Sequence, residues 1–202
     1  MQEIYIDQAV QQPVPAGISE VPEKPLYKQL TWWVLVFPLL MFVGIFMHNI
    51  FIVNFTHVIS GALWTGVDIV MGFIIGPILR KLRPDQRKAF INWFVPKIIL
   101  YIPILAFTTG TAGWTMASWM GMISPSSPDF TKIVIALIII TILAISGFGF
   151  LLPNQIRTYL ELKKPQPDIQ KVFRLNSRNN IFAGIQGVFQ VAIILVMAMI
   201  VM

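Results

Sequence analysis

The chain has 202 residues, of which 56% are hydrophobic and only 12% are charged, and its mean hydropathy is +0.73. A soluble domain carries about 25% charged residues, so this composition excludes a soluble globular protein and indicates an integral membrane protein in contact with lipid. The net charge of +6 is attributed to basic loops beside the membrane rather than to nucleic-acid binding, and the absence of cysteine excludes disulfides and thiolate metal sites.

The first 30 residues are polar and contain several prolines. They lack the basic start and short apolar core of a signal peptide, so we expect a cytoplasmic N-terminal tail over 1–30 and a membrane domain over 31–202. About 20 apolar residues suffice to cross a bilayer as a helix. The prediction is an all-α bundle of five transmembrane helices, over about 31–53, 54–79, 90–120, 130–152 and 181–202.

Prolines and charges complete this topology. Proline lacks the backbone donor of a helix interior, so Pro77 is expected to close the second helix and Pro153 the fourth. The segment 80–88 contains five Lys or Arg residues and one acidic residue. The segment 154–180 contains six Lys or Arg residues and two acidic residues. Five helices place both segments on one side, which the positive-inside rule identifies as the cytoplasm. The N-terminus is then expected in the cytoplasm and the C-terminus outside.

The second expected helix carries polar and small residues on one face. At about 100° per residue, His57, Gly61, Trp64 and Asp68 fall within roughly 40° of one another. An ionisable side chain inside a bilayer needs a partner and is a functional candidate. We therefore expect this face to contact protein or a cofactor rather than lipid.

His57 and Lys132 are expected at a similar depth, about one turn in from the outer surface. One interpretation is that Lys132 extends to the outer headgroups while His57 caps a loop. The alternative is a pair of nitrogen donors facing a cofactor, with Lys132 neutral.

Asp68 lies deeper, near the middle of the bilayer. Lys97 is its expected partner in an intramembrane ion pair, with the Thr108 and Thr109 region as the second choice. A proton-relay or ligand role for Asp68 is the alternative.

Small and amide residues predict further helix contacts. Gly72 and Gly76 form a small-xxx-small pattern that permits close helix approach. Gln186 and Gln190 lie one turn apart on the last helix, and we expect both to face the interior of the bundle.

Four segments in order resemble the HemJ-type protoporphyrinogen oxidases and the related copper-resistance D-type membrane proteins. Residues 57–66 read HVISGALWTG and resemble the first helix of that family. Residues 105–114 read LAFTTGTAGW and resemble its second helix, while residues 129–134 read DFTKIV and resemble the start of its third. Residues 173–176 read FRLN and are similar to the entry to its last helix. The expected helix over 31–53 is additional to this four-helix core.

The resemblance implies a b-type haem associated with His57 and Lys132, and Gly61 and Trp64 share the face that would look at it. The expected location is a prokaryotic cell membrane. The leading hypothesis is a haem-b-binding redox protein or redox-complex subunit, with no catalytic residue assigned. The alternatives are a non-catalytic subunit of a larger membrane complex and a copper transporter, and the transporter would lack the usual Cys or His/Met cluster.

Overall fold

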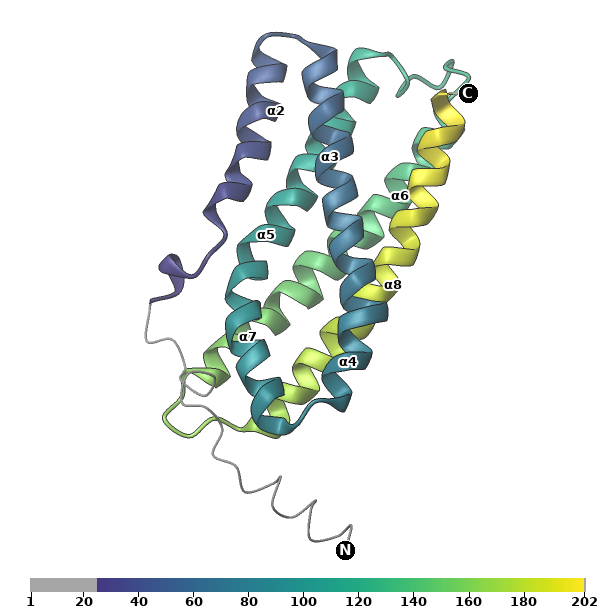
Figure 1. Cartoon of the computed structure of the whole chain (residues 1–202). Coiled ribbons are helices and arrows are strands. Elements are labelled where there is room, and N and C mark those ends of the chain that lie inside the picture. Colours follow the sequence, from purple (N-terminus) through teal and green to yellow (C-terminus); the bar gives the residue numbers. More distant parts are fainter. Residues whose placement is uncertain (1–24, 202) are drawn as a thin grey trace, which may run out of the picture.

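The computed structural model describes residues 25–201, and every regular element in this part of the chain is a helix. Residues 1–24 of the expected tail lie outside the described residues. Figure 1 shows long helices packed side by side. The elements are η1 (Leu26–Lys28), η2 (Trp32–Leu35), α2 (Val36–Phe46), α3 (Ile50–Ile69), η3 (Val70–Ile75), α4 (Gly76–Lys81), α5 (Pro84–Trp119), α6 (Phe130–Ser146), η4 (Gly147–Leu151), α7 (Leu152–Leu162) and α8 (Ile169–Val201).

Four continuous helices are long and apolar enough to cross a membrane, and they confirm an all-helical membrane architecture. They are Ile50–Lys81, Pro84–Trp119, Phe130–Leu162 and Ile169–Ile200. The fifth expected span is shorter, with four residues in η2 and eleven in α2. That length corresponds to about 22 Å, less than the roughly 30 Å of a hydrocarbon core.

The turn between α2 and α3 comes earlier than the predicted boundary at residues 53 and 54. His48 adopts a left-handed backbone conformation with φ of 53°, and its ring lies 4.2 Å from that of Trp119 at the end of α5. Asn49 then caps α3, since its Oδ1 accepts a hydrogen bond from Ile52 N at 3.2 Å. The predicted end of the first helix, at 53, and the predicted start of the second, at 54, are therefore several residues too late.

The prediction that Pro77 and Pro153 end helices is wrong. Each proline follows a π-helical segment, η3 before Pro77 and η4 before Pro153, and the helix continues for several residues beyond it. Proline removes one backbone donor and crowds the carbonyl four residues earlier. A π turn forms backbone hydrogen bonds between residues five apart instead of four, so the hydrogen-bond pattern changes at the position where that donor is missing. The predicted loop over 154–180 is consequently mostly helix.

Both basic segments lie at one end of the bundle, as predicted. In Figure 1, α4, α7 and the start of α8 are together at the lower end, while the α2–α3 turn and the C-terminal end of α8 are at the upper end. Helix α2 covers only part of this length. Thr31 Oγ1 donates to the Lys97 carbonyl at 3.0 Å, a point about 20 Å along α5 from its first residue.

Glycines set the contact that η3 and the start of α4 make with α8. A Cβ added at Gly72 would lie 2.2 Å from the Cα of Gly184, and one added at Gly76 would lie 3.1 Å from the Cβ of Asn180. The predicted small-xxx-small contact is confirmed, and its partner is α8.

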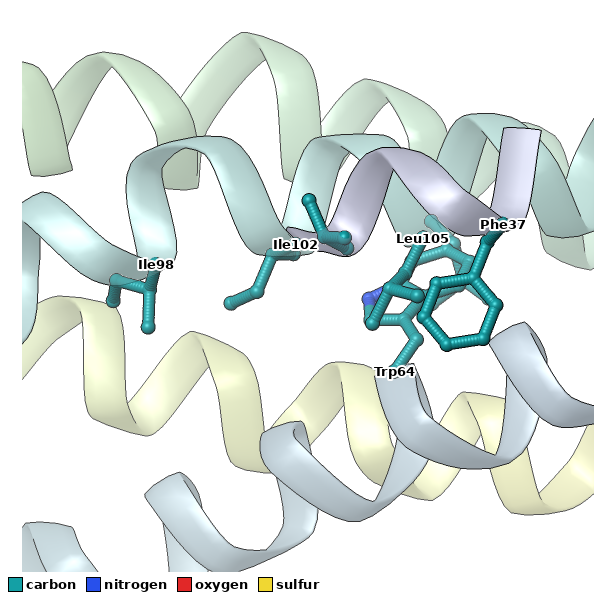
Figure 2. Close-up of a cluster of buried hydrophobic side chains, with 7 residues drawn as sticks. Phe37, Trp64, Ile98, Ile102 and Leu105 are labelled. Carbon is teal, nitrogen blue, oxygen red and sulfur yellow. The ribbon is translucent and has the colours of Figure 1, made fainter. Parts of the chain in front are cut away.

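An apolar cluster joins α2, α3, α5 and α6. Trp64 is its central residue, and Figure 2 shows its ring between Phe37 and the α5 side chains Ile102 and Leu105. This packing fixes the indole of Trp64 beside the polar interior described next.

Candidate functional site

Asp68 is completely buried, as expected for a carboxyl group that faces the bundle interior. Gln190 of α8 donates from Nε2 to Asp68 Oδ2 at 2.9 Å, whereas Asp68 Oδ1 is buried with no hydrogen-bond partner in the described part of the chain. The expected ion pair with Lys97 is not formed, because Lys97 is exposed. Thr108 is not the partner either, since its hydroxyl donates to the Ile104 carbonyl.

Trp64 lies one helical turn before Asp68 and is 3% exposed. Its indole interacts with the Asp68 carboxyl group. Its Nε1 nevertheless makes no hydrogen bond of good geometry within residues 25–201 and is buried. The Asp68 carboxyl group is therefore the acceptor that this donor faces, in a geometry poorer than that of a full hydrogen bond.

A cavity of about 240 Å³ lies between α5 on one side and α6 with η4 on the other. Its walls are mostly apolar, while Trp64, Gln155 and Gln186 contribute polar groups. The cavity is partly open, and Phe107 and Phe148, which line it, are exposed residues within apolar spans. The opening therefore faces sideways, toward lipid.

Gln186 gives this cavity an unused acceptor. Its Nε2 donates to the Leu143 carbonyl at 3.0 Å, which identifies the other side-chain atom as the amide oxygen. That oxygen, Oε1, is buried and has no partner in the described residues. The prediction that Gln186 and Gln190 face the interior is confirmed, with 1% and 2% exposure.

A second, smaller cavity of about 20 Å³ adjoins the first and shares Ile102, Leu151 and Gln155 with it. Its polar lining residues come from α3, α7 and α8, and they are Asp68, Gln155, Thr158, Asn176, Asn179 and Asn180. Asp68 is the one ionisable residue among those that line it.

His57 contacts α5 rather than a cavity. Its Nδ1 lies 2.8 Å from the Thr109 carbonyl, so this nitrogen carries the proton and Nε2 is the acceptor of the ring. The ring packs against Gly113, where an added Cβ would lie 2.8 Å from Cε1. Gly61 likewise makes room for Thr109, with 3.3 Å between an added Cβ and the threonine methyl.

Lys132 contacts different elements from His57. Its Nζ forms a salt bridge with Asp129 Oδ1 at 2.9 Å and donates to the Met199 carbonyl of α8 at 2.8 Å. Neither His57 nor Lys132 lines either of the two cavities. The four-residue face of α3 does point inward, but its members meet different partners along the bundle.

Helix α7 contributes polar side chains from a segment that the sequence pattern predicts to be a loop. Polar residues recur there with a helical spacing, and Asn154, Gln155, Thr158 and Glu161 are all buried. This period of 3.6 could have identified an inward polar face.

Clusters of three or more His, Cys, Asp or Glu side chains able to hold a metal are absent from the described residues. No protein-family model, curated protein or solved structure matches this chain.

Proposed function

We propose that this protein binds a small hydroxylated lipophile inside the membrane, in the cavity between α5 and α6. The observation that carries the proposal is that two lining residues have buried polar atoms without a well-formed hydrogen bond, the Trp64 N–H beside Asp68 and the Gln186 Oε1 acceptor. A single hydroxyl group can accept a hydrogen bond from the first and donate one to the second. An apolar body would fill the remaining walls.

The cavity volume of about 240 Å³ limits the ligand. Pockets for drug-sized ligands measure about 300–1,000 Å³, so this cavity suits a single substituted ring better than a macrocycle. The head group of a membrane quinol has this size, a hydroxyl at the ring edge and an apolar tail that can leave through the lateral opening. Quinol binding also agrees with the redox role implied by the sequence resemblance.

We further propose that the basic end of the bundle faces the cytoplasm, following the positive-inside rule. Helix α8 begins at that end, so the C-terminus is then outside. The accessibility of single cysteines introduced beside Arg83 and beside Ser126 to a membrane-impermeant thiol reagent tests this orientation.

Gly110→Leu is expected to block the cavity. Gly110 lines it, and a Cβ added there meets no atom within 4 Å, so the larger side chain enters free space without a backbone clash. Binding of a radiolabelled short-chain benzoquinol to the protein in lipid nanodiscs should weaken more than about tenfold, because the added side chain occupies the ligand's volume. Gly66→Leu is the matched control, since its added Cβ also meets no atom within 4 Å and Gly66 does not line the cavity.

Trp64→Phe tests the hydrogen bond separately from the volume. It keeps an aromatic ring and removes the N–H, so benzoquinol binding should fall by roughly tenfold. The oxidised quinone has no hydroxyl to donate to Gln186 and should bind more weakly than the quinol. Equal binding to the Gly110→Leu and Gly66→Leu variants would rule out this cavity as the site.

Haem b ligated by His57 is the second candidate. Ligating histidines usually donate their other ring N–H to a carbonyl or carboxylate, and the contact between His57 Nδ1 and the Thr109 carbonyl has this form. Lys132 does not fit as the second haem ligand, because a cationic Nζ in a salt bridge with Asp129 has no lone pair for a metal. Bound at His57, a haem would supply one-electron transfer.

The haem candidate predicts a b-type band in the reduced-minus-oxidised spectrum of the native protein. His57→Ala should abolish the band, whereas Lys132→Ala should leave it unchanged, because the Lys132 contacts are structural. His48→Ala is the histidine control. A colourless native protein, or a band that persists in His57→Ala, contradicts this candidate.

A further inference from the structure

Several oxygen atoms beside the smaller cavity lack a donor. Asp68 Oδ1, Asn176 Oδ1 and Asn179 Oδ1 are buried without a hydrogen-bond partner in the described part of the chain, and their residues line the same 20 Å³ space. The atom assignment at Asn179 follows from its contact, because Nδ2 donates to the Leu151 carbonyl at 3.2 Å and Oδ1 must be the other atom.

Three buried oxygen acceptors without a hydrogen-bond partner require an added donor group or a cation. Each buried acceptor without a partner costs about 1–3 kcal/mol, and a buried carboxylate without a countercharge costs more. Gln190 supplies one N–H to Asp68 and the Trp64 indole interacts with the same carboxyl group, but Gln190 Oε1 is also buried and unpaired. The surroundings of Asp68 therefore contain more acceptors than the protein's donors satisfy.

The size and charge of the cavity restrict what can enter. A water molecule needs at least about 10–15 Å³ of such space, so the volume of about 20 Å³ holds one particle of that size. Asp68 is the one ionisable lining residue, and a single positive charge neutralises it. A divalent ion would leave a net charge inside the membrane, which is unfavourable. Carboxylate and amide oxygens suit hard cations.

We infer that this cavity binds one small monovalent cation against Asp68, either Na⁺ or a proton held by the Asp68 carboxyl group beside a water molecule. The inference does not depend on lipophile binding, because it rests on a different cavity and on different unpaired atoms.

The test compares full-length wild type, Asp68→Asn and Asp85→Asn in nanodiscs. Asp85 is the matched carboxylate, exposed at the basic end and paired with Arg83 at 3.3 Å. Radioactive Na⁺ should bind wild type with one saturable site, bind Asp85→Asn equally, and bind Asp68→Asn at least about tenfold more weakly, because the variant removes the charge. Choline chloride replaces NaCl to keep the ionic strength constant.

The proton alternative has its own readout. Wild type would then bind no Na⁺ but show an infrared carboxyl band that shifts within seconds of transfer to D₂O, and this band would be absent only from Asp68→Asn. Na⁺ binding that survives Asp68→Asn overturns the inference. So does a wild type with neither Na⁺ binding nor a rapidly exchanging carboxyl proton.

A second variant covers the case in which Asp68→Asn does not fold. Asn176→Leu keeps the carboxyl group and removes one lining oxygen, so cation affinity should fall about tenfold. Asn92→Leu replaces another buried asparagine, on α5 and outside the cavity, and should bind as wild type does. Equal affinity in these two variants would also overturn the inference.

Discussion

Gly72→Ala is expected to lower the free energy of unfolding by about 3 kcal/mol, at the upper end of the range for overpacking. The new methyl group would lie 2.2 Å from Gly184 Cα and 2.6 Å from Gly184 N. These are backbone atoms, so no side-chain rotation relieves the clash, and η3 and α8 must separate. Unfolding of the purified protein in mixed micelles with increasing dodecyl sulfate measures the change.

The same substitution at two other glycines gives a graded comparison. A Cβ at Gly184 would lie 3.2 Å from Gly72 Cα, so Gly184→Ala should cost only about 1 kcal/mol. Gly66→Ala meets no atom within 4 Å and should be neutral or stabilising by up to about 1 kcal/mol, since alanine favours helix. Equal stability of the three variants would mean that η3 and α8 are not in this contact.

Gln190→Leu is expected to destabilise the protein by about 3 kcal/mol, because it leaves a buried Asp68 without its hydrogen-bond donor. The same dodecyl sulfate titration reports the loss. Phe189→Leu changes the preceding, exposed residue on α8 and should alter stability by less than about 0.5 kcal/mol.

A double variant separates the interaction from the loss of one side chain. Asp68→Leu combined with Gln190→Leu removes both polar groups, so it should be more stable than Gln190→Leu alone. If the stability losses of Asp68→Leu and Gln190→Leu, each measured alone, add up to the loss of the double variant, these side chains do not interact across α3 and α8.

The inward orientation of polar residues followed from helical periodicity alone. Asp68, Gln186 and Gln190 were expected in the interior and are buried there. Periodicity fixes direction around a helix axis but not the neighbour on another helix. Opposite charge favours Lys97 as the partner of Asp68, yet Lys97 points outward on α5, while Ile98 of the same helix lines the Asp68 cavity.

The π-helical segments are the second point at which the structure differs from the fold predicted from the sequence. A sequence pattern with proline favours a helix end, so η3 and η4 could not be foreseen as passages through which helices continue past Pro77 and Pro153. The helix beyond Pro153 is α7, and α8 begins at Ile169, twelve residues before the predicted start at 181. Gln155, Thr158 and Asn176, which supply polar lining, lie in these helical segments outside the predicted helices.

The sideways opening of the cavity between α5 and α6 determines what a ligand competes with. The exposed residues Phe107 and Phe148 line it, so its surroundings are lipid tails and not water. Occupancy then depends on the mole fraction of the ligand among membrane lipids, because each acyl chain beside the opening competes for the same apolar walls. A dissociation constant expressed as an aqueous concentration would change with the amount of lipid, whereas one expressed per lipid would not.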